Sequence, residues 1–516
     1  MPRSDVPLSQ SPYSAPYMSL GSEIVDNFYL ERSQSETAKS PFWLVGSQGL
    51  LLMRSRSLSN SCRGLFTTSS NRTFGAWGNG LFEVLNQGST RVQVGELRSF
   101  SGPVRFAENG YQMILVDGQC GYIFDLTSSA FSQILDQYFP GLDDPTKGPT
   151  HVACVDTYFL VNSSGTNRYY WSAPYYQPYA FDATHPSAKN LWWGLQYGQK
   201  IGDTDQIIGM ISNVNLLWVF GQNSMEIHQD TGNSAGQLFE RISTAPIGFG
   251  CAAPDSICKY GNEVFWLGRD RVGTVGVFSC GTDFQPRRIS TRGIETRIQR
   301  YERIDDCWSY SYAIDGHAYV VWNFPSGTSV DEGPVVGATW CFDLTTQTWT
   351  RRTRWDTVSG TSSRWPAQWA TYNWSKLLMG DGTTDCLYQL TPDKYENDHP
   401  DGGGTDKINR VVTSPIGYNA GRNMRYHSVQ LNMQQGTGLR NGPGSDPLVM
   451  MAASDDSGFT YGYERFASIG QTGLYKSRTR WTRCGMGRNR VWRFRITEPV
   501  RVVVVSMTIE AVAVDR

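Results

Sequence analysis

Residues 216–294 decide the fold: LLWVFGQNSMEIHQDTGNSAGQLFERISTAPIGFGCAAPDSICKYGNEVFWLGRDRVGTVGVFSCGTDFQPRRISTRGI. Twice in this stretch an apolar run of β-branched and aromatic residues stops at a glycine turn and then resumes. The runs at 216–220 and 225–228 flank Gly221, and those at 264–267 and 274–278 flank the turn at 268–273. Such pairs are typical of β-hairpins. Two similar hairpins in succession predict a repeated β-unit.

The same pattern recurs on both sides of this stretch. Further instances lie at 75–85, 108–131, 155–172, 313–349 and 373–391. Successive units begin roughly 35 to 60 residues apart, a range that brackets the roughly 40 to 50 residue repeat of β-propeller blades. The 53 glycines, and the aromatic content of 17 Trp, 26 Tyr and 23 Phe, favour short strands joined by tight turns. We therefore expect an all-β protein with a propeller of six or seven blades.

The ends of the chain differ from this repeat. Residues 1–22 are rich in Pro, Ser and Tyr and predict an extended arm, ordered only against a partner or another domain. With a strand expected at 24–30, the N-terminal arm and first strand span 1–39. The propeller is expected over 40–392, and a glycine-rich linker over 393–423. In 424–516 apolar and polar residues alternate strictly within strands, which predicts a C-terminal β-sandwich.

Composition limits the classes of function. The chain of 516 residues has 46 basic and 47 acidic side chains and a formal net charge of -1, which argues against tight wrapping of nucleic acid through phosphate neutralisation. The N-terminus lacks the apolar core of a secretion signal, and no segment has the roughly 20 apolar residues of a membrane span. The ten scattered cysteines, without a C-x-x-C pair, predict reduced core thiols in a protein made in the cytosol.

Catalytic motifs are missing from the sequence. There is no G-x-S-x-G elbow, H-E-x-x-H motif, Walker loop or dinucleotide fingerprint, and the six histidines are widely separated. Residues 454–461, SDDSGFTY, resemble the Asp-box turn of sialidase-like propellers, in which the box is structural. We therefore expect no enzyme activity, no catalytic or metal-binding residues and no cofactor.

A basic run and one helix supply the candidate contact residues. Nine Lys or Arg and the single acid Glu498 lie between Lys476 and Arg501, and in VWRFRI the arginines share one strand face while Trp492, Phe494 and Ile496 share the other. The run is expected to form a solvated or salt-bridged outer face, or alternatively a subunit interface or a lining near DNA. Residues 294–303, IETRIQRYER, predict a short helix. The candidate residues are Arg488, Arg490, Arg493, Arg495, Arg297 and Arg300.

Several phrases together resemble the packaged-DNA stabilisation proteins of short-tailed bacteriophages, the tail hub or nozzle family. They are NFYLE at 27–31 with AKSP at 38–41, RGL at 63–65, DQIIG at 205–209, VFG at 219–221 with MEI at 225–227, FWLG at 265–268, RIST at 288–291 and SDD at 454–456. One departure is QGL at 48–50, where the family pattern has Pro-Gly-Leu.

The resemblance implies a structural virion protein, assembled in the bacterial cytoplasm. Such proteins form a ring, usually of six copies, beneath the portal and adaptor, where they retain packaged DNA and dock a tail spike, fibre or needle. Double-stranded DNA would pass through the channel without sequence-specific binding, and no membrane insertion is expected. The alternatives are a carbohydrate-active propeller enzyme, sialidase-like or a depolymerase, and a receptor-binding tail module.

Overall fold

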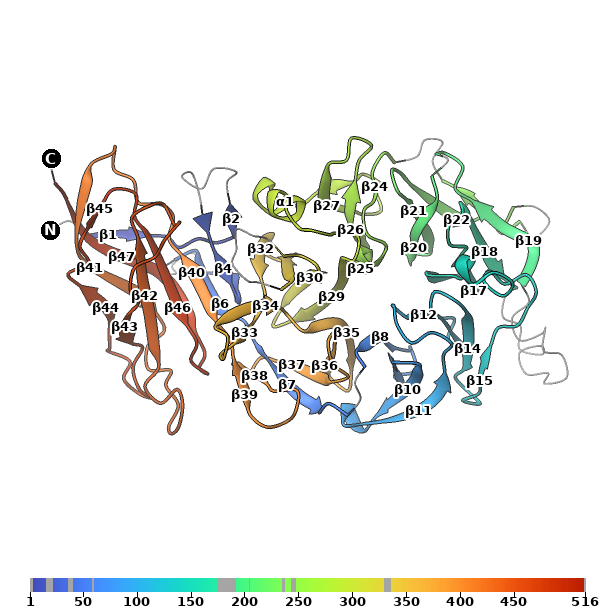
Figure 1. Cartoon of the computed structure of the whole chain (residues 1–516), viewed down its shortest axis with the longest axis horizontal. Helices are drawn as coiled ribbons and strands as arrows, with labels where there is room; N and C mark the ends of the chain where they lie inside the picture. Colours follow the sequence, from blue (N-terminus) through green and yellow to red (C-terminus); the bar gives the residue numbers. More distant parts are fainter. Residues whose placement is uncertain are drawn as a thin grey trace.

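The computed structural model describes residues 3–14, 22–35, 40–57, 60–173, 192–203, 205–233, 237–242, 247–328 and 336–514. Strands dominate it. Figure 1 shows a ring of small sheets on the right and a narrower pair of sheets on the left, where both termini lie. The predicted all-β class, with a propeller and a C-terminal sandwich, is confirmed.

The blades of the propeller follow one another along the chain as antiparallel sheets. The first three are β8 (Cys62–Thr67), β9 (Thr73–Trp77), β10 (Gly80–Leu85) and β11 (Thr90–Glu96); β12 (Arg105–Glu108), β13 (Gln112–Val116), β14 (Gly121–Asp125) and β15 (Phe131–Gln133); and β16 (Val152–Val155), β17 (Tyr158–Asn162), β18 (Arg168–Ser172) and β19 (Trp192–Gln199). The two hairpins at 216–228 and 264–278 lie in the fourth and fifth blades. These are β20 (Ile207–Asn213), β21 (Leu216–Gly221), β22 (Met225–Asp230) and β23 (Phe239–Arg241), then β24 (Gly250–Cys251), β25 (Cys258–Tyr260), β26 (Glu263–Arg269), β27 (Val275–Cys280) and β28 (Arg287–Arg288).

The last two blades connect the ring to the rest of the molecule. One consists of β29 (Trp308–Ile314), β30 (His317–Phe324), β31 (Ala338–Asp343) and β32 (Thr348–Arg351). The other consists of β35 (Ala367–Asn373), β36 (Lys376–Asp381) and β37 (Leu387–Thr391), and its fourth strand is the early β7 (Gly49–Arg54). In the described part of the chain, seven sheets thus form the blades of the ring. Pairing of an early strand with the last blade closes the ring and leaves fewer exposed edges.

The sandwich is assembled from both ends of the chain. Its first sheet has the order β44 (Thr479–Thr482), β41 (Asn423–Met433), β47 (Val503–Val514), β6 (Phe42–Gly46) and β5 (Phe28–Arg32), with β1 (Arg3–Val6) on β47 and β45 (Met486–Gly487) on β41. Its second sheet contains β4 (Val25–Asp26), β40 (Arg410–Thr413), β46 (Val491–Ile496), β42 (Leu448–Ser454) and β43 (Arg465–Ser468), and β4 also pairs with β32 of the propeller. The sheets therefore join strands from 1–39, 40–392 and 393–423 to the C-terminal segment.

The alternation in VWRFRI explains how the two sandwich sheets hold together. Trp492, Phe494 and Ile496 are buried between them with Val429 and Met451, while the arginines of the same strand point the other way. Because successive strand residues face opposite sides, one face joins the core and the other remains available for polar contacts. This part of the strand prediction is confirmed.

Short elements connect these sheets. They are the hairpins β2 (Tyr13–Ser14) with β3 (Ser22–Glu23), β33 (Thr353–Asp356) with β34 (Thr361–Arg364) and β38 (Glu396–Asp398) with β39 (Thr405–Lys407), and the 3-10 turns at Asn86–Gly88, Pro145–Lys147 and Pro254–Ser256. The helix α1 spans Arg292–Gln299 rather than 294–303. Its predicted apolar residues Ile294 and Ile298 are buried, but the helix ends early because the chain turns so that Tyr301 can also pack into the blade.

Candidate interaction surfaces

Arg493 and Arg495 share one carboxylate on the outer face of the second sandwich sheet. Glu464 lies 3.6 Å from a guanidinium nitrogen of Arg493 and 2.5 Å from one of Arg495. The Arg493 guanidinium also lies 4.1 Å from the ring centre of Tyr461, and burial lowers its pKa. The Arg495 guanidinium lies 5.8 Å from the ring of Trp355, in the hairpin that follows the propeller blade of β29–β32. This pair is therefore salt-bridged and partly covered, with side chains 28% and 27% exposed.

Arg490 and Arg488 lie just before the same strand and have different environments. Arg490 is buried, with a side chain 4% exposed, and donates two hydrogen bonds of 2.6 Å to Asp455. Its guanidinium stacks on the rings of Tyr426 and Trp492 at 4.8 and 5.2 Å. Arg488 is exposed and donates to the side-chain oxygen of Asn423 at 3.1 Å. Arg490 is thus held inside the sandwich, whereas Arg488 reaches the surface.

Arg297 and Arg300 belong to a different part of the molecule. Arg297 is half-buried on α1, with its guanidinium 5.4 Å from the ring centre of Trp340, and Arg300 is the exposed residue that caps the helix. Figure 1 shows α1 on the propeller, apart from β46. The structure therefore brings only Arg493 and Arg495 together, at Glu464. Arg490 is buried within the sandwich, Arg488 lies beside β41 of the first sheet, and the helix arginines lie near neither.

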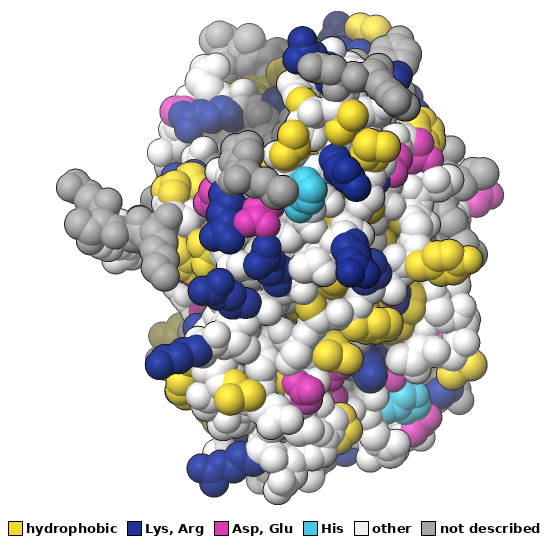
Figure 2. Space-filling model, turned by 90° about the vertical axis from the view of Figure 1, so that its left-hand side faces the viewer, with side chains coloured by type: hydrophobic (Ala, Val, Ile, Leu, Met, Phe, Trp, Pro, Cys, Tyr) yellow, Lys and Arg dark blue, Asp and Glu magenta, His cyan; other side chains and the backbone are white. Residues whose placement is uncertain are grey.

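The basic run predicted from the sequence supplies only part of a larger basic surface on the outer face of the first sandwich sheet. Figure 2 shows this end of the molecule, with basic side chains spread over it and fewer acidic ones. We call it the basic face, and it comprises the exposed residues Arg3, Arg422, Arg425, Arg480, Arg483 and Arg488. The outward positions of β41 and β44 carry some of these residues, but β1 adds Arg3 through its pairing with β47. Since these segments lie far apart in the chain, only strand pairing reveals the surface.

Glu510 is clamped within the basic face. Its carboxylate accepts hydrogen bonds from Ser428 at 2.6 Å, Arg3 at 2.6 Å and Arg480 at 2.7 Å. The hydrogen bonds from Ser428 and Arg3 lower the pKa of Glu510 to about 2. Arg3 and Arg480 are thereby held in position around an ionised carboxylate. The other four arginines of the basic face give it a net positive charge.

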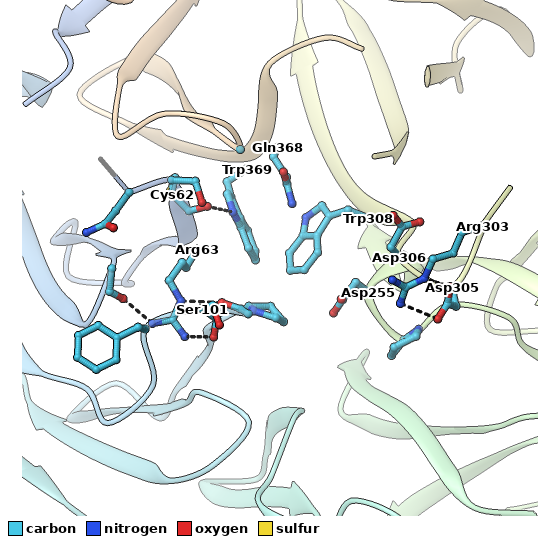
Figure 3. A pocket seen from close by; sticks show the side chains of 18 residues that line it. Cys62, Arg63, Ser101, Asp255, Arg303, Asp305, Asp306, Trp308, Gln368 and Trp369 are labelled. Carbon is cyan, nitrogen blue, oxygen red and sulfur yellow. Dashed lines mark hydrogen bonds and ion pairs between the residues drawn. The ribbon is translucent and has the colours of Figure 1, made fainter. Parts of the chain in front are cut away.

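A cavity of about 610 Å³ opens at one end of the propeller channel (Figure 3). A second cavity of about 490 Å³ runs along the channel, and Arg105, Asp255, Trp308 and Trp369 connect the channel wall to this mouth. The residues that line the mouth come from different blades and include Asn60, Cys62, Arg63, Phe100, Asp255, Arg303, Asp305, Asp306, Trp308, Gln368 and Trp369.

Charges at the mouth of the channel are compensated. Arg105 pairs with Asp255, and Arg303 pairs with Asp305 at 2.5 Å. Arg63 donates to the backbone oxygens of Gly78, Ser99, Ser101 and Gly102 and to the Ser99 hydroxyl, so its donors are used within the protein. The walls are consequently polar without a strong excess of either sign.

The described residues contain no group of three His, Cys, Asp or Glu side chains placed to hold a metal ion. The Asp-box-like turn is closed on itself, because Ser454 Oγ donates to Asp456 at 2.5 Å and accepts from the Gly458 amide at 2.8 Å. This confirms its structural role. Within the described ranges, no helix is long and apolar enough to cross a membrane.

A propeller joined to a sandwich that both chain ends build defines the class of this chain as an all-β protein of two domains. The family model described as "Bacteriophage P22 Gp10, beta-propeller" matches residues 30–395, and "Bacteriophage P22 Gp10, beta-sandwich" matches residues 409–512. The chain belongs to the bacteriophage P22 Gp10 family, the packaged-DNA stabilisation or tail nozzle proteins. The resemblance noted in the sequence is confirmed. The family is one of structural phage virion proteins, which implies a non-enzymatic role and virion partners.

No curated protein matches the chain. Among solved structures, the extracellular domain of the putative hybrid two component system BT4673 from B. thetaiotaomicron is 10% identical with a TM-score of 0.40, covering 78% of this chain and 45% of that one. A chain of the mitotic checkpoint complex is 9% identical with a TM-score of 0.37, covering 70% of this chain and 97% of that one. The chain thus spans under half of the first of these, and likenesses this weak carry no argument about function.

Proposed function

We propose that this protein is a subunit of a short phage tail that assembles into a ring, the nozzle or tail hub, below the portal and adaptor. The ring, usually of six copies in this family, would continue the DNA channel, retain the packaged genome and dock a tail spike, fibre or needle. Double-stranded DNA would pass through without sequence-specific binding, and assembly would take place in the bacterial cytoplasm. Support comes from the family match over both domains.

The basic face is the observation that carries the ring proposal. Arginines outnumber carboxylates on it, although the whole chain has a net charge of -1. The rest of each copy therefore carries a net negative charge, which favours a contact between the basic face of one copy and an acidic part of the next. A contact between two different surfaces of identical subunits is heterologous, and it closes into a ring when the rotation between neighbours allows. Complementary charge would also fix the register of the contact.

Imaging of the purified protein by negative-stain electron microscopy tests the ring. A ring with an axial hole is expected, and a monomer at all protein concentrations would contradict the proposal. Arg425→Glu combined with Arg488→Glu should give folded monomers by light scattering, because both side chains are exposed on the basic face. Arg287→Glu is a matched control, since Arg287 is also exposed but lies on the propeller, beside Asp283.

Arg493 and Arg495 on β46 give a second and separate test of the same ring. If Arg493 and Arg495 make the subunit contact, Arg493→Ala with Arg495→Ala should yield folded monomers. An unchanged ring would assign the pair to the internal contacts with Glu464 and Trp355 instead. Turnover of a labelled polysaccharide or sialoside by the purified protein, abolished by a carboxylate substitution, would overturn the structural role and favour a carbohydrate-active enzyme.

A further inference from the structure

Two neighbouring loops at one end of the sandwich form a protruding tip, which we call the loop tip and which comprises residues 434–447 and 469–478. The first loop joins β41 to β42 and the second joins β43 to β44, and Figure 1 shows loops projecting past the ends of β43 and β44. Ser477 Oγ donates to the side-chain oxygen of Gln435 at 2.8 Å, and the Gly436 amide donates to a backbone oxygen of the second loop at 3.2 Å. The two loops therefore hold each other in place.

Three large apolar side chains are exposed on the loop tip. Leu439 of the first loop is 43% exposed, and Leu474 and Tyr475 of the second are 53% and 73% exposed. A Cβ added at Gly436 would lie 2.9 Å from Cδ1 of Tyr475, so the ring already packs on the backbone of the first loop and its remaining surface faces solvent. Large apolar side chains that gather on an exposed surface are typical of an interaction site.

The loop tip is also basic. Arg440, Lys476 and Arg478 are exposed, and none of them forms an ion pair with another residue that the structure describes. The single carboxylate in the sequence of the two loops, Asp446, accepts a hydrogen bond of 2.6 Å from the Ser468 hydroxyl. The excess of basic side chains favours an anionic partner, because unpaired cations beside an anionic surface lower the electrostatic free energy of contact.

A bilayer with anionic headgroups fits this combination better than a folded acidic protein does. Leu439 and Tyr475 protrude from turns, so a folded partner would need a matching hollow for each of them. The headgroup layer of a bilayer needs no such match. Leucine and tyrosine side chains can reach the acyl boundary, while lysine and arginine keep their charged ends at the lipid phosphates.

We propose that the loop tip is a peripheral docking site for a bilayer that contains anionic phospholipid. The three apolar side chains would enter the headgroup layer, and the three basic side chains would contact lipid phosphates. No segment of the chain would cross the bilayer. The contact goes beyond the tail-subunit role. Each copy has its own loop tip, so several copies in one assembly would bind more tightly than one.

Co-sedimentation of the purified full chain with vesicles tests the proposal. Vesicles of phosphatidylcholine with about one third phosphatidylglycerol should pellet several times more protein than vesicles of phosphatidylcholine alone. About 0.5 M NaCl should weaken binding to the anionic vesicles, because it screens the basic side chains. Leu474→Ser with Tyr475→Ser should lower the bound fraction about fivefold or more. Arg440→Glu with Lys476→Glu should lower it by a similar factor of about five.

Phe459→Ser with Tyr463→Ser is the matched control for the apolar pair. Both side chains are exposed, at 59% and 98%, but their loop joins the opposite ends of β42 and β43, so vesicle binding should be unchanged. Circular dichroism of each variant reports the fold, and the charge variant keeps the test usable if the serine variant unfolds. Light scattering reports ring assembly separately, so failure of the loop tip and failure of the ring are distinguishable.

Three results would overturn the proposal: no binding to the anionic vesicles, equal binding to both kinds of vesicle, or binding unaffected by both loop-tip variants. Capture of the protein by immobilised poly-glutamate but not by vesicles would also overturn it. Loss of that capture in Arg440→Glu with Lys476→Glu would then assign the loop tip to an acidic protein.

Discussion

His317 is predicted to make the stability of this protein fall as the pH rises from 6 to 8.5. The residue is buried on β30 and lies between two carboxylates, Asp343 at 2.7 Å and Glu31 at 2.9 Å. Glu31 belongs to β5 of the sandwich, whereas Asp343 ends β31 of the propeller, so the protonated imidazole ties the two domains together. Burial opposes protonation, but the hydrogen bonds to Asp343 and Glu31 outweigh it and raise the pKa of His317 to about 9.

The size of the effect follows from the difference in pKa between the folded and unfolded states. An unfolded histidine titrates near pH 6.5, and each unit of pKa difference is worth about 1.4 kcal/mol, so the charged imidazole contributes about 3 kcal/mol below pH 6.5. Because the folded pKa is raised, the folded state binds more protons between pH 6.5 and 9, and the stabilisation is lost as the pH rises through that window. Between pH 6 and 8.5 the expected loss is about 2 kcal/mol.

Urea unfolding followed by tryptophan fluorescence at pH 6, 7.5 and 8.5 measures this loss. His317→Gln should be destabilised most at pH 6 and should have a flatter pH dependence, because it cannot carry the charge. His427→Gln is a control on the outer sandwich face and should keep the wild-type dependence. If wild type and His317→Gln lose the same stability between pH 6 and 8.5, the coupling of this histidine to the two carboxylates is refuted.

Two further substitutions test the packing around the sandwich and the ring closure. Arg490→Ala removes two hydrogen bonds to Asp455 and should lower the unfolding free energy by about 2 kcal/mol. The loss is limited to this size because Asp455 stays partly solvated. In thermal melts, the control Arg488→Ala should be nearly neutral. Gly49→Ala would place a Cβ 2.0 Å from a backbone oxygen of the β38–β39 hairpin and should cost about 3 kcal/mol or more. Gly403→Ala, with open space around the added carbon, should leave the melting temperature close to wild type, and equal melting temperatures for both alanine variants would contradict the close approach at Gly49.

Much of the fold could be predicted because local patterns report burial. Residues 264–267 and 274–278 read as two runs separated by a glycine turn, and they form β26 and β27. The alternation around Arg493 and Arg495 placed the apolar residues of β46 in the core. The end of α1 was wrong by several residues because helix boundaries depend on where the following chain packs.

The candidate sites were harder to predict than the fold. Arg490 looked like its neighbours in the basic run, yet it is buried against Asp455, and no local signal distinguishes it from exposed Arg488. The channel mouth was not anticipated at all. Trp308 and Trp369 lie in separate blades, and an aromatic residue in a strand is most often packing.

Local patterns were enough to predict the β class, the repeated hairpins and the inward face of the sandwich strands, because glycine turns and the two-residue side-chain period are properties of neighbouring residues. The family was indicated by the order of its short phrases along the chain. Three features depend on the folded chain: β7 completes the last blade, Arg3 joins Arg480 around Glu510, and Trp308 packs against Trp369 at the channel mouth. The reason is physical. Local periodicity fixes which face of a strand is buried, whereas the partner of that strand depends on the packing of segments hundreds of residues apart.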